Sequence, residues 1–170
     1  MWHRYSDALR QAVLTANDDL TRRGDRDMST RHLLMGIWKA RGHGHEILRR
    51  LGVDQTSLQD AFDGAKPREE GGSGRCEPGL TNDARAMVDR AYVLARDIKD
   101  QYVGDEHFLI SMLMDPIGSD AGEILMRLDL SVEVVVHEVV DLQKDRLHAP
   151  AASKNRLSVR GAGRPPDKRR

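Results

Sequence analysis

The chain has 170 residues and a mass of 19.1 kDa, which corresponds to one ordinary domain or two very small ones. Its 27 basic residues balance 27 acidic residues, so no global charge selects nucleic acid or a membrane as partner. The single cysteine, Cys76, excludes an internal disulfide framework and a multi-cysteine zinc site, and no stretch approaches the roughly 20 apolar residues of a membrane span. We therefore expect a cytoplasmic protein.

Two helices of the same design are expected to open the two halves of the chain. Each carries one apolar stripe at i, i+3, i+4 spacing, and each follows a hydroxyl residue, Ser6 or Thr81, in the position of an N-cap. The stripes consist of Leu9, Ala12, Val13, Ala16 and Leu20 in the first half, and of Ala84, Met87, Val88, Ala91 and Ala95 in the second.

The later segments of each half also favour helices. Residues 32–38 and 107–114 are apolar on most sides, which is typical of central, buried helices. Short helices are expected around residues 47–48 and 124–125, and fourth helices near Asp54 and Ser131. The valine-rich run at 132–140 could be read alone as a strand, but its counterpart at 54–62 has no strand pattern, so we predict a helix and an all-α fold.

An internal repeat unites these elements. At an offset of 75 the first half aligns with the second, and after a two-residue slip EILRRL at 46–51 aligns with EILMRL at 123–128. Matched positions include Ser6 with Thr81, Val13 with Val88, Ala16 with Ala91, His32 with His107 and Leu34 with Leu109. Two copies of one structural plan are therefore predicted.

The composition divides the chain into four segments. The copies occupy residues 5–63 and 80–147, and a linker rich in glycine and charge, GAKPREEGGSGRCEPG, lies between them at 64–79. Residues 148–170 form a basic tail that we expect to be disordered: from 149 onward it has seven Lys or Arg against the single Asp167, leaving 20 basic and 26 acidic residues upstream.

The run YVGDEHFL at 102–109, preceded by Leu80-Thr81 and followed by EIL at 123–125, resembles the repeat of the Clp N-terminal domain family. The first copy is similar at residues 28–34 and 47–53, so the resemblance spans about residues 5–142. It implies two pseudo-symmetric four-helix repeats packed into one compact all-α domain. The sequence contains no G-x-x-x-x-G-K-[ST] phosphate loop, so it resembles free-standing Clp-N proteins that lack ATPase modules.

This resemblance implies a non-enzymatic accessory of the Clp chaperone and protease system. Such a protein would bind Clp ATPase or protease subunits, or their protein substrates, as an adaptor, a modulator or a decoy of an unfoldase N-domain. The alternative is a nucleic-acid-associated protein that contacts phosphates through its basic tail, and such a complex would weaken steeply with salt. The sequence shows no nucleophile and base constellation, so we expect no enzyme and no cofactor.

Some family members bind phosphoarginine through the threonine that starts the first helix and the glutamate before the motif histidine of each repeat. The resemblance therefore assigns Thr81 and Glu106 as candidates in the second repeat and Ser6 in the first, where Arg31 reverses the charge of the glutamate. A helix N-terminus favours phosphate and a carboxylate pairs with guanidinium. The alternative is structural: Thr81 is a plain N-cap and Glu106 complements the dipole of its helix.

The histidines are expected to be structural or exposed. His32 and His107 lie at equivalent places and are predicted to bond a neighbouring backbone group. His43 and His45 flank a glycine and, without spaced further ligands, are predicted to lie in a solvent-exposed loop that holds no metal.

Overall fold

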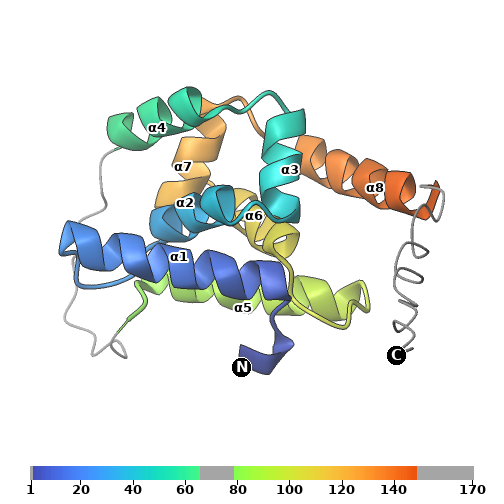
Figure 1. Ribbon diagram of the computed structural model, residues 1–170, viewed down its shortest axis with the longest axis horizontal. Helices are drawn as coiled ribbons and strands as arrows, with labels where there is room; N and C mark the ends of the chain where they lie inside the picture. The colour runs from blue at the N-terminus through green and yellow to red at the C-terminus, as the bar shows by residue number, and fades with distance from the viewer. Residues whose placement is uncertain (1, 66–78, 149–170) are drawn as a thin grey trace, which may run out of the picture.

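The computed structural model describes residues 2–65 and 79–148, which form two sets of four α-helices (Figure 1). The first set comprises α1 (Asp7–Arg23), α2 (Thr30–Ala40), α3 (His43–Arg50) and α4 (Gln55–Gly64), after a short 3-10 turn, η1 (Trp2–Arg4). The second comprises α5 (Asn82–Asp97), α6 (Asp105–Met114), α7 (Asp120–Arg127) and α8 (Val132–His148). The all-α prediction is confirmed, including the helix at the valine-rich run. Most of the expected linker and nearly all of the basic tail lie outside the described residues.

Helix α1 begins and ends where its sequence predicts. Ser6 adopts extended backbone angles and its Oγ accepts a hydrogen bond from the N–H of Leu9 at 3.1 Å, which caps the first turn. At the other end Gly24 takes the left-handed conformation, with φ of 74°, which glycine adopts without steric cost. Between these ends α1 packs the predicted stripe against α2, with Leu9 and Ala16 buried and Val13 half-buried.

The second helix of each set forms the centre of the core. Leu34 and Ile37 of α2 and Leu109 and Met112 of α6 are fully buried, as expected for helices that are apolar on most sides. Helix α2 approaches α1 closely because position 36 is a glycine: a Cβ there would clash with the carbonyl oxygen of Ala12 and touch the Ala16 Cβ at 3.0 Å.

The two repeats are joined by a reciprocal exchange of backbone hydrogen bonds. The segment before α1 pairs with the loop before α6 through Ser6 N to Val103 O at 2.9 Å and Val103 N to Arg4 O at 2.8 Å. The segment before α5 pairs in the same way with the loop before α2, through Thr81 N to Met28 O at 3.0 Å. Each repeat therefore holds the entry to the other repeat's first helix.

Helix α8 lies at one end of the molecule (Figure 1) and packs on α6 and α3. Val135 and Leu142 face the core, whereas Val134, Val136 and Val140 remain exposed. Across the described parts of the chain, no helix has both the length and the apolar character needed to cross a membrane.

Candidate functional site

Two equivalent junctions, related by the repeat, join the halves of the domain. We call the first the Thr30 junction; it contains Thr30, Arg31, Asp83, Asp120 and Ala121. The hydroxyl of Thr30, the buried first residue of α2, donates to Asp83 Oδ2 at 2.8 Å and accepts from the N–H of Ala121 at 3.1 Å. One side chain of the first repeat thus connects the first turns of α5 and α7 in the second.

The Asp105 junction, formed by Asp105, Glu106, His43, Gly42 and Gly44, is its counterpart. Asp105 begins α6 and is fully buried, and its Oδ2 accepts a hydrogen bond from the N–H of Gly44 at 2.8 Å. Glycine leaves the space that this carboxylate occupies, because a Cβ on Gly42 would clash with Asp105 Oδ2. The second repeat here holds the start of α3 through a carboxylate, where the first repeat uses a hydroxyl.

The Asp105 junction concentrates negative charge. Asp105 and Glu106 are adjacent carboxylates, and His43 Nδ1 lies 3.6 Å from Glu106 Oε2. Among the described residues, neither carboxylate forms an ion pair with a lysine or arginine. Burial, and then repulsion from Glu106, raises the pKa of Asp105 to about 6. Burial acts on Glu106 in the same direction, but the nearby imidazole of His43 and backbone hydrogen bonding outweigh it and lower the pKa of Glu106.

The three residues that the sequence singled out fall at two separate places. Helices α1 and α5 run in opposite directions along one edge of the molecule (Figure 1), so Ser6 and Thr81 start them at opposite ends. Ser6 bonds to Val103, three residues before Glu106, and lies at the Asp105 end. Thr81 is separated from Glu106 by the 16 residues of α5, about 24 Å of helix. The structure therefore does not bring Thr81 and Glu106 into one pocket.

Thr81 differs from the plain N-cap that its sequence position suggests. It has the extended backbone of an N-cap residue, but its side chain makes no capping hydrogen bond. The hydroxyl instead bonds to the Met28 carbonyl at 3.2 Å and to the carboxylate of Asp83. A carboxylate two residues into the helix and a carbonyl from the other repeat compete successfully for this hydroxyl.

His32 and His107 perform the shared structural role that we predicted. His32 Nδ1 accepts from the N–H of Ser29 at 3.1 Å, and His107 Nδ1 accepts from the N–H of Gly104 at 2.9 Å. Burial, with help from Arg31, lowers the pKa of His32 despite its 2.9 Å contact with Asp25. The stability contributed by neutral His32 is therefore present above about pH 6.5 and is lost as the pH falls through the lowered folded pKa.

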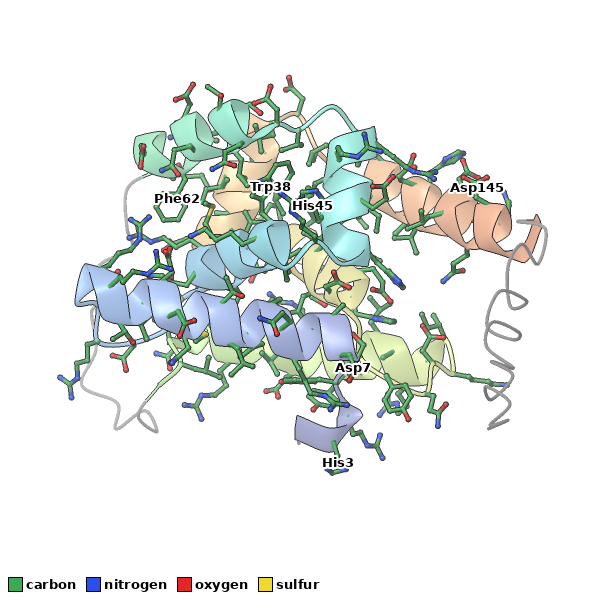
Figure 2. The ribbon with its side chains drawn as sticks, in the orientation of Figure 1. His3, Asp7, Trp38, His45, Phe62 and Asp145 are labelled. Carbon is green, nitrogen blue, oxygen red and sulfur yellow. The ribbon has the colours of Figure 1, made fainter. Side chains whose placement is uncertain are left out.

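The prediction of an exposed loop at His43 and His45 was wrong. Both lie in the first turn of α3 and are half-buried, and the Gly44 between them is buried. His45 Nδ1 lies 2.7 Å from the carbonyl oxygen of Trp38, and the two rings are 4.5 Å apart (Figure 2). The polar letters HGH resemble a loop, but Asp105 holds the N–H of Gly44 and thereby fixes the helix start.

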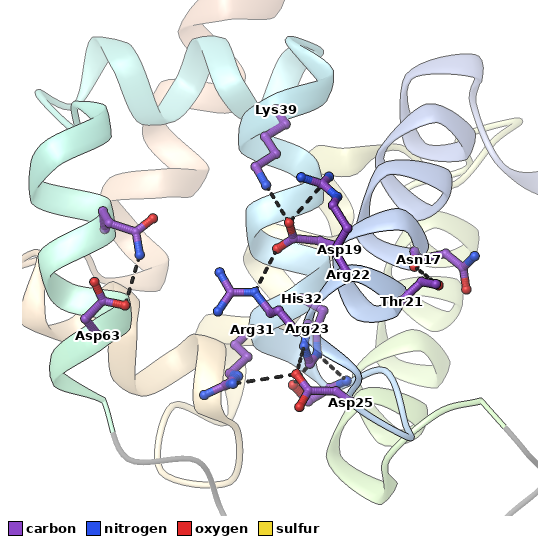
Figure 3. Close-up of polar contacts among 12 residues, drawn as sticks. Asn17, Asp19, Thr21, Arg22, Arg23, Asp25, Arg31, His32, Lys39 and Asp63 are labelled. Atoms are coloured by element: carbon purple, nitrogen blue, oxygen red, sulfur yellow. Dashed lines mark hydrogen bonds and ion pairs between the residues drawn. The ribbon is translucent and has the colours of Figure 1, made fainter.

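The charged side chains near the Thr30 junction make ion pairs, hydrogen bonds and a ring contact within the domain. Asp19 of α1 is nearly buried and accepts from Lys39 Nζ at 2.9 Å and Arg23 Nε at 3.2 Å (Figure 3). Burial opposes ionisation, but these cations outweigh it and lower the pKa of Asp19. The Arg31 guanidinium lies over the Phe62 ring at 4.8 Å and 4.0 Å from the Asp25 carboxylate. The contacts of Asp19 and Arg31 at this end therefore serve to hold the helices together.

A shallow notch lies beside the Asp105 end. It has a volume of about 230 Å³ and is lined by Tyr5, Ser6, Asp7, Arg10 and Tyr102. A second depression of about 180 Å³ shares Tyr102 and includes three cations, Arg4, Arg96 and Lys99, together with Asp100. Tyr102, which is 47% exposed, stands between the two. We call the pair of depressions the Tyr102 groove. Sequence reasoning used Tyr102 only as part of a motif, although an exposed aromatic in a loop is a signal of binding.

The fold and its two junctions define a helical double-repeat domain. The chain belongs to the Clp N-terminal domain family, since the family described as the Clp repeat (R) N-terminal domain matches residues 4–128. The match covers both junctions and the Tyr102 groove.

Curated relatives are Clp ATPases. The chain is 22% identical over 148 residues to the chaperone protein ClpB of Oceanobacillus iheyensis and 23% identical over 143 residues to the negative regulator of genetic competence ClpC/MecB of Bacillus subtilis. Each match covers 84% of this chain, yet the chain spans only 17% of the length of either relative. The similarity is confined to one domain's length of these larger proteins.

Solved structures share the fold. The N-terminal domain of ClpD from Arabidopsis thaliana superposes with a TM-score of 0.64 at 17% identity, covering 85% of this chain and 97% of that one. The Hsp104 N-terminal domain from Candida albicans gives 0.63 at 14% identity, covering 82% and 91%. The N-terminal domain of ClpV1 ATPase from E. coli gives 0.64 at 18% identity, covering 84% and 88%.

Proposed function

We propose that the protein is a non-enzymatic, cytoplasmic accessory of the Clp chaperone and protease system. It binds protein substrates or Clp components, as an adaptor, a modulator or a decoy for the N-domain of an unfoldase. The observation that carries this proposal is the Clp N-terminal domain fold over residues 4–128. A domain of this kind can supply recognition while the motor resides on another chain.

The Tyr102 groove is the proposed contact surface. It lies where the start of α1 in the first repeat meets the loop between α5 and α6 in the second, so it forms only when both repeats are docked. Tyr102 offers an exposed ring, and Arg4, Arg96 and Lys99 offer cations. An exposed aromatic among cations favours an extended, acidic peptide.

The phosphoarginine hypothesis is favoured at the Ser6 end. Ser6 caps α1 beside Arg10, whose guanidinium pairs with the phosphate in this hypothesis, and Glu106, the second residue of α6, lies at the same end. The hydroxyl of Thr81 is bonded to Asp83, whose negative charge opposes phosphate, whereas Asp7 at the Ser6 end is exposed and pairs with Arg10 at 3.4 Å. Titration with phosphoarginine and with arginine tests the idea. Binding that requires the phosphate and weakens in Ser6→Ala and Glu106→Gln supports it, and equal binding of the two compounds contradicts it.

A quantitative pull-down tests the accessory role. The full chain and a Tyr102→Ala variant are immobilised and exposed to lysate of the source cells, and Clp ATPase and protease subunits are measured by mass spectrometry. We expect recovery by the full chain and a loss of about tenfold for Tyr102→Ala, the scale of one aromatic hot spot. Val134→Ala, on the exposed face of α8, is the matched control. If Clp subunits and their substrates are absent from the full-chain eluate, the proposal is wrong.

The nucleic-acid alternative rests on the basic composition of residues 149–170. Its test is binding of duplex DNA by the full chain and by a chain ending at residue 148. If the tail carries the function, the full chain binds with an affinity that falls steeply between low and physiological salt, and the shortened chain does not bind.

A further inference from the structure

Three potential metal ligands converge at the Asp105 junction. His43 comes from α3 of the first repeat, and Asp105 and Glu106 come from α6 of the second. One ligand atom from each lies within 4.8 Å of the other two. Ligand atoms of a tetrahedral zinc ion are about 3.3 Å apart, so a small rotation of His43, whose side chain is 42% exposed, can complete the geometry.

Two buried carboxylate oxygens at this place lack a hydrogen-bond partner. They are Asp105 Oδ1 and Glu106 Oε2. Asp105 is fully buried and uses only its other oxygen, which accepts from the N–H of Gly44. Buried carboxylate oxygens are normally paired with a donor or coordinate a metal, so Asp105 Oδ1 in particular indicates a missing cationic partner.

The surrounding groups supply little positive charge. His107 Nδ1 lies 3.5 Å from Glu106 Oε1, but it already accepts the N–H of Gly104 and so has no proton there to donate. The walls near the glycines are apolar: Ala8 lies by Gly42, and Ile37 and Leu109 lie by Gly44. His43 is thus the one imidazole that the described residues direct at both carboxylates.

We propose that His43, Asp105 and Glu106 form a binding site for a divalent transition-metal ion, with Zn²⁺ as the ion that fits the donors best. One imidazole nitrogen and two carboxylate oxygens suit zinc, whereas Mg²⁺ prefers oxygen ligands alone. The ion neutralises the adjacent carboxylates and links α3 to α6, so its binding fastens one repeat to the other.

Comparison with the Thr30 junction shows why we propose a metal site at only one of the two junctions. The residues equivalent to His43, Asp105 and Glu106 are Asp120, Thr30 and Arg31. That set has one carboxylate, Asp120, one guanidinium, Arg31, and the hydroxyl of Thr30 where the Asp105 junction has a buried carboxylate. The donor set that suits Zn²⁺, one imidazole and two carboxylates, is therefore found at only one of the two equivalent junctions.

Isothermal titration of the full chain tests the site. Every protein carries Cys76→Ser to remove the thiol, is stripped with a chelator, and is titrated with ZnCl₂ and separately with MgCl₂. We expect one Zn²⁺ per chain, weaker binding of Mg²⁺, and a melting temperature that rises by roughly 5–10 °C at a hundredfold excess over Kd.

The variants decide whether the ion lies at the proposed place. His43→Ala and Asp105→Asn should each weaken Zn²⁺ binding by at least about tenfold. Asparagine retains an acceptor for Gly44, and circular dichroism verifies the fold. The matched control is His137→Ala, which removes a surface imidazole 3.1 Å from Asp141. No zinc binding, or an affinity that neither variant lowers relative to this control, overturns the proposal.

Discussion

The Thr30 and Asp105 junctions are the same structural device built with different chemistry. In each, the first residue of a central helix accepts an N–H from the start of a helix in the other repeat, Ala121 in one case and Gly44 in the other. Thr30 donates its own proton to Asp83, so the hydroxyl of Thr30 has a partner both as donor and as acceptor. Asp105, as a carboxylate, has no proton of its own to donate, and its neighbour Glu106 is a second carboxylate. Symmetric architecture therefore does not imply symmetric charge, and binding of a cation is expected at the junction that concentrates negative charge.

The Thr30 junction should be the more sensitive of the two to loss of its polar group. Thr30→Val keeps the shape but leaves the N–H of Ala121 and a carboxylate oxygen of Asp83 without their partner. We expect a loss of roughly 3 kcal/mol in the free energy of unfolding. Urea denaturation measures it, with Thr30→Ser as the control that retains the hydroxyl. A Thr30→Val protein as stable as Thr30→Ser would show that the junction does not depend on this bond.

A glycine distinguishes the Asp105 junction sterically. A Cβ at Gly44 would lie 2.6 Å from Ile37 Cγ2 and 3.2 Å from Leu109 Cδ1, whereas the equivalent residue Ala121 already carries one. Gly44→Ala should cost about 2 kcal/mol through overpacking. Thermal denaturation checks this, and Gly52→Ala is unsuitable as a control because its φ of 83° adds strain. An unchanged melting temperature for Gly44→Ala would mean that Ile37 yields without cost.

The charge difference between the junctions should appear as a pH dependence in the presence of EDTA. The folded pKa of Asp105, about 6, lies above the unfolded value, so the native state binds a proton more tightly and loses stability as the pH rises from about 4 through 6. Asp105→Asn removes this loss. We expect the variant to be more stable than the parent by about 1–2 kcal/mol at pH 7, and not at pH 4. If the stability of the variant relative to the parent is lower at pH 7 than at pH 4, the pKa of Asp105 is not raised in the folded state.

The smallest expected contrast concerns the two N-cap positions. Ser6→Ala removes the acceptor of the Leu9 N–H and should cost about 1 kcal/mol. Thr81→Ala removes no capping bond, and its effect should be smaller. Chemical denaturation of the two variants side by side resolves the order. Equal losses would show that the bond from Thr81 to Met28 is worth as much as a cap.

Local pattern predicted most of the architecture. Apolar spacing placed α1 and α5, hydroxyls marked their starts, and the repeat gave the second helices their central position. The valine-rich run of α8 was predicted as a helix because its counterpart in the first repeat has no strand pattern, since its own composition also fits a strand. These features depend on residues close in sequence, and the offset between copies supplied the rest.

The candidate site was less accessible to sequence reasoning. The pairing of Asp105 with Gly44 joins residues 61 apart, and it depends on how the repeats dock. The same docking separates Thr81 from Glu106 and converts the HGH segment into a helix start. Alignment of the copies does reveal one useful signal, which is that Thr30 is replaced by Asp105 in the second copy.

The reciprocal backbone pairing at the entries of α1 and α5 has a consequence for the single repeat. Tyr5 pairs with Val103 while Leu80, its equivalent, pairs with Met28, the equivalent of Val103. A contact in which position i of one copy meets position j of the other, and j meets i, is the signature of an isologous interface. Each repeat thus presents the self-complementary face of a homodimer, and the chain contains that dimer within one polypeptide.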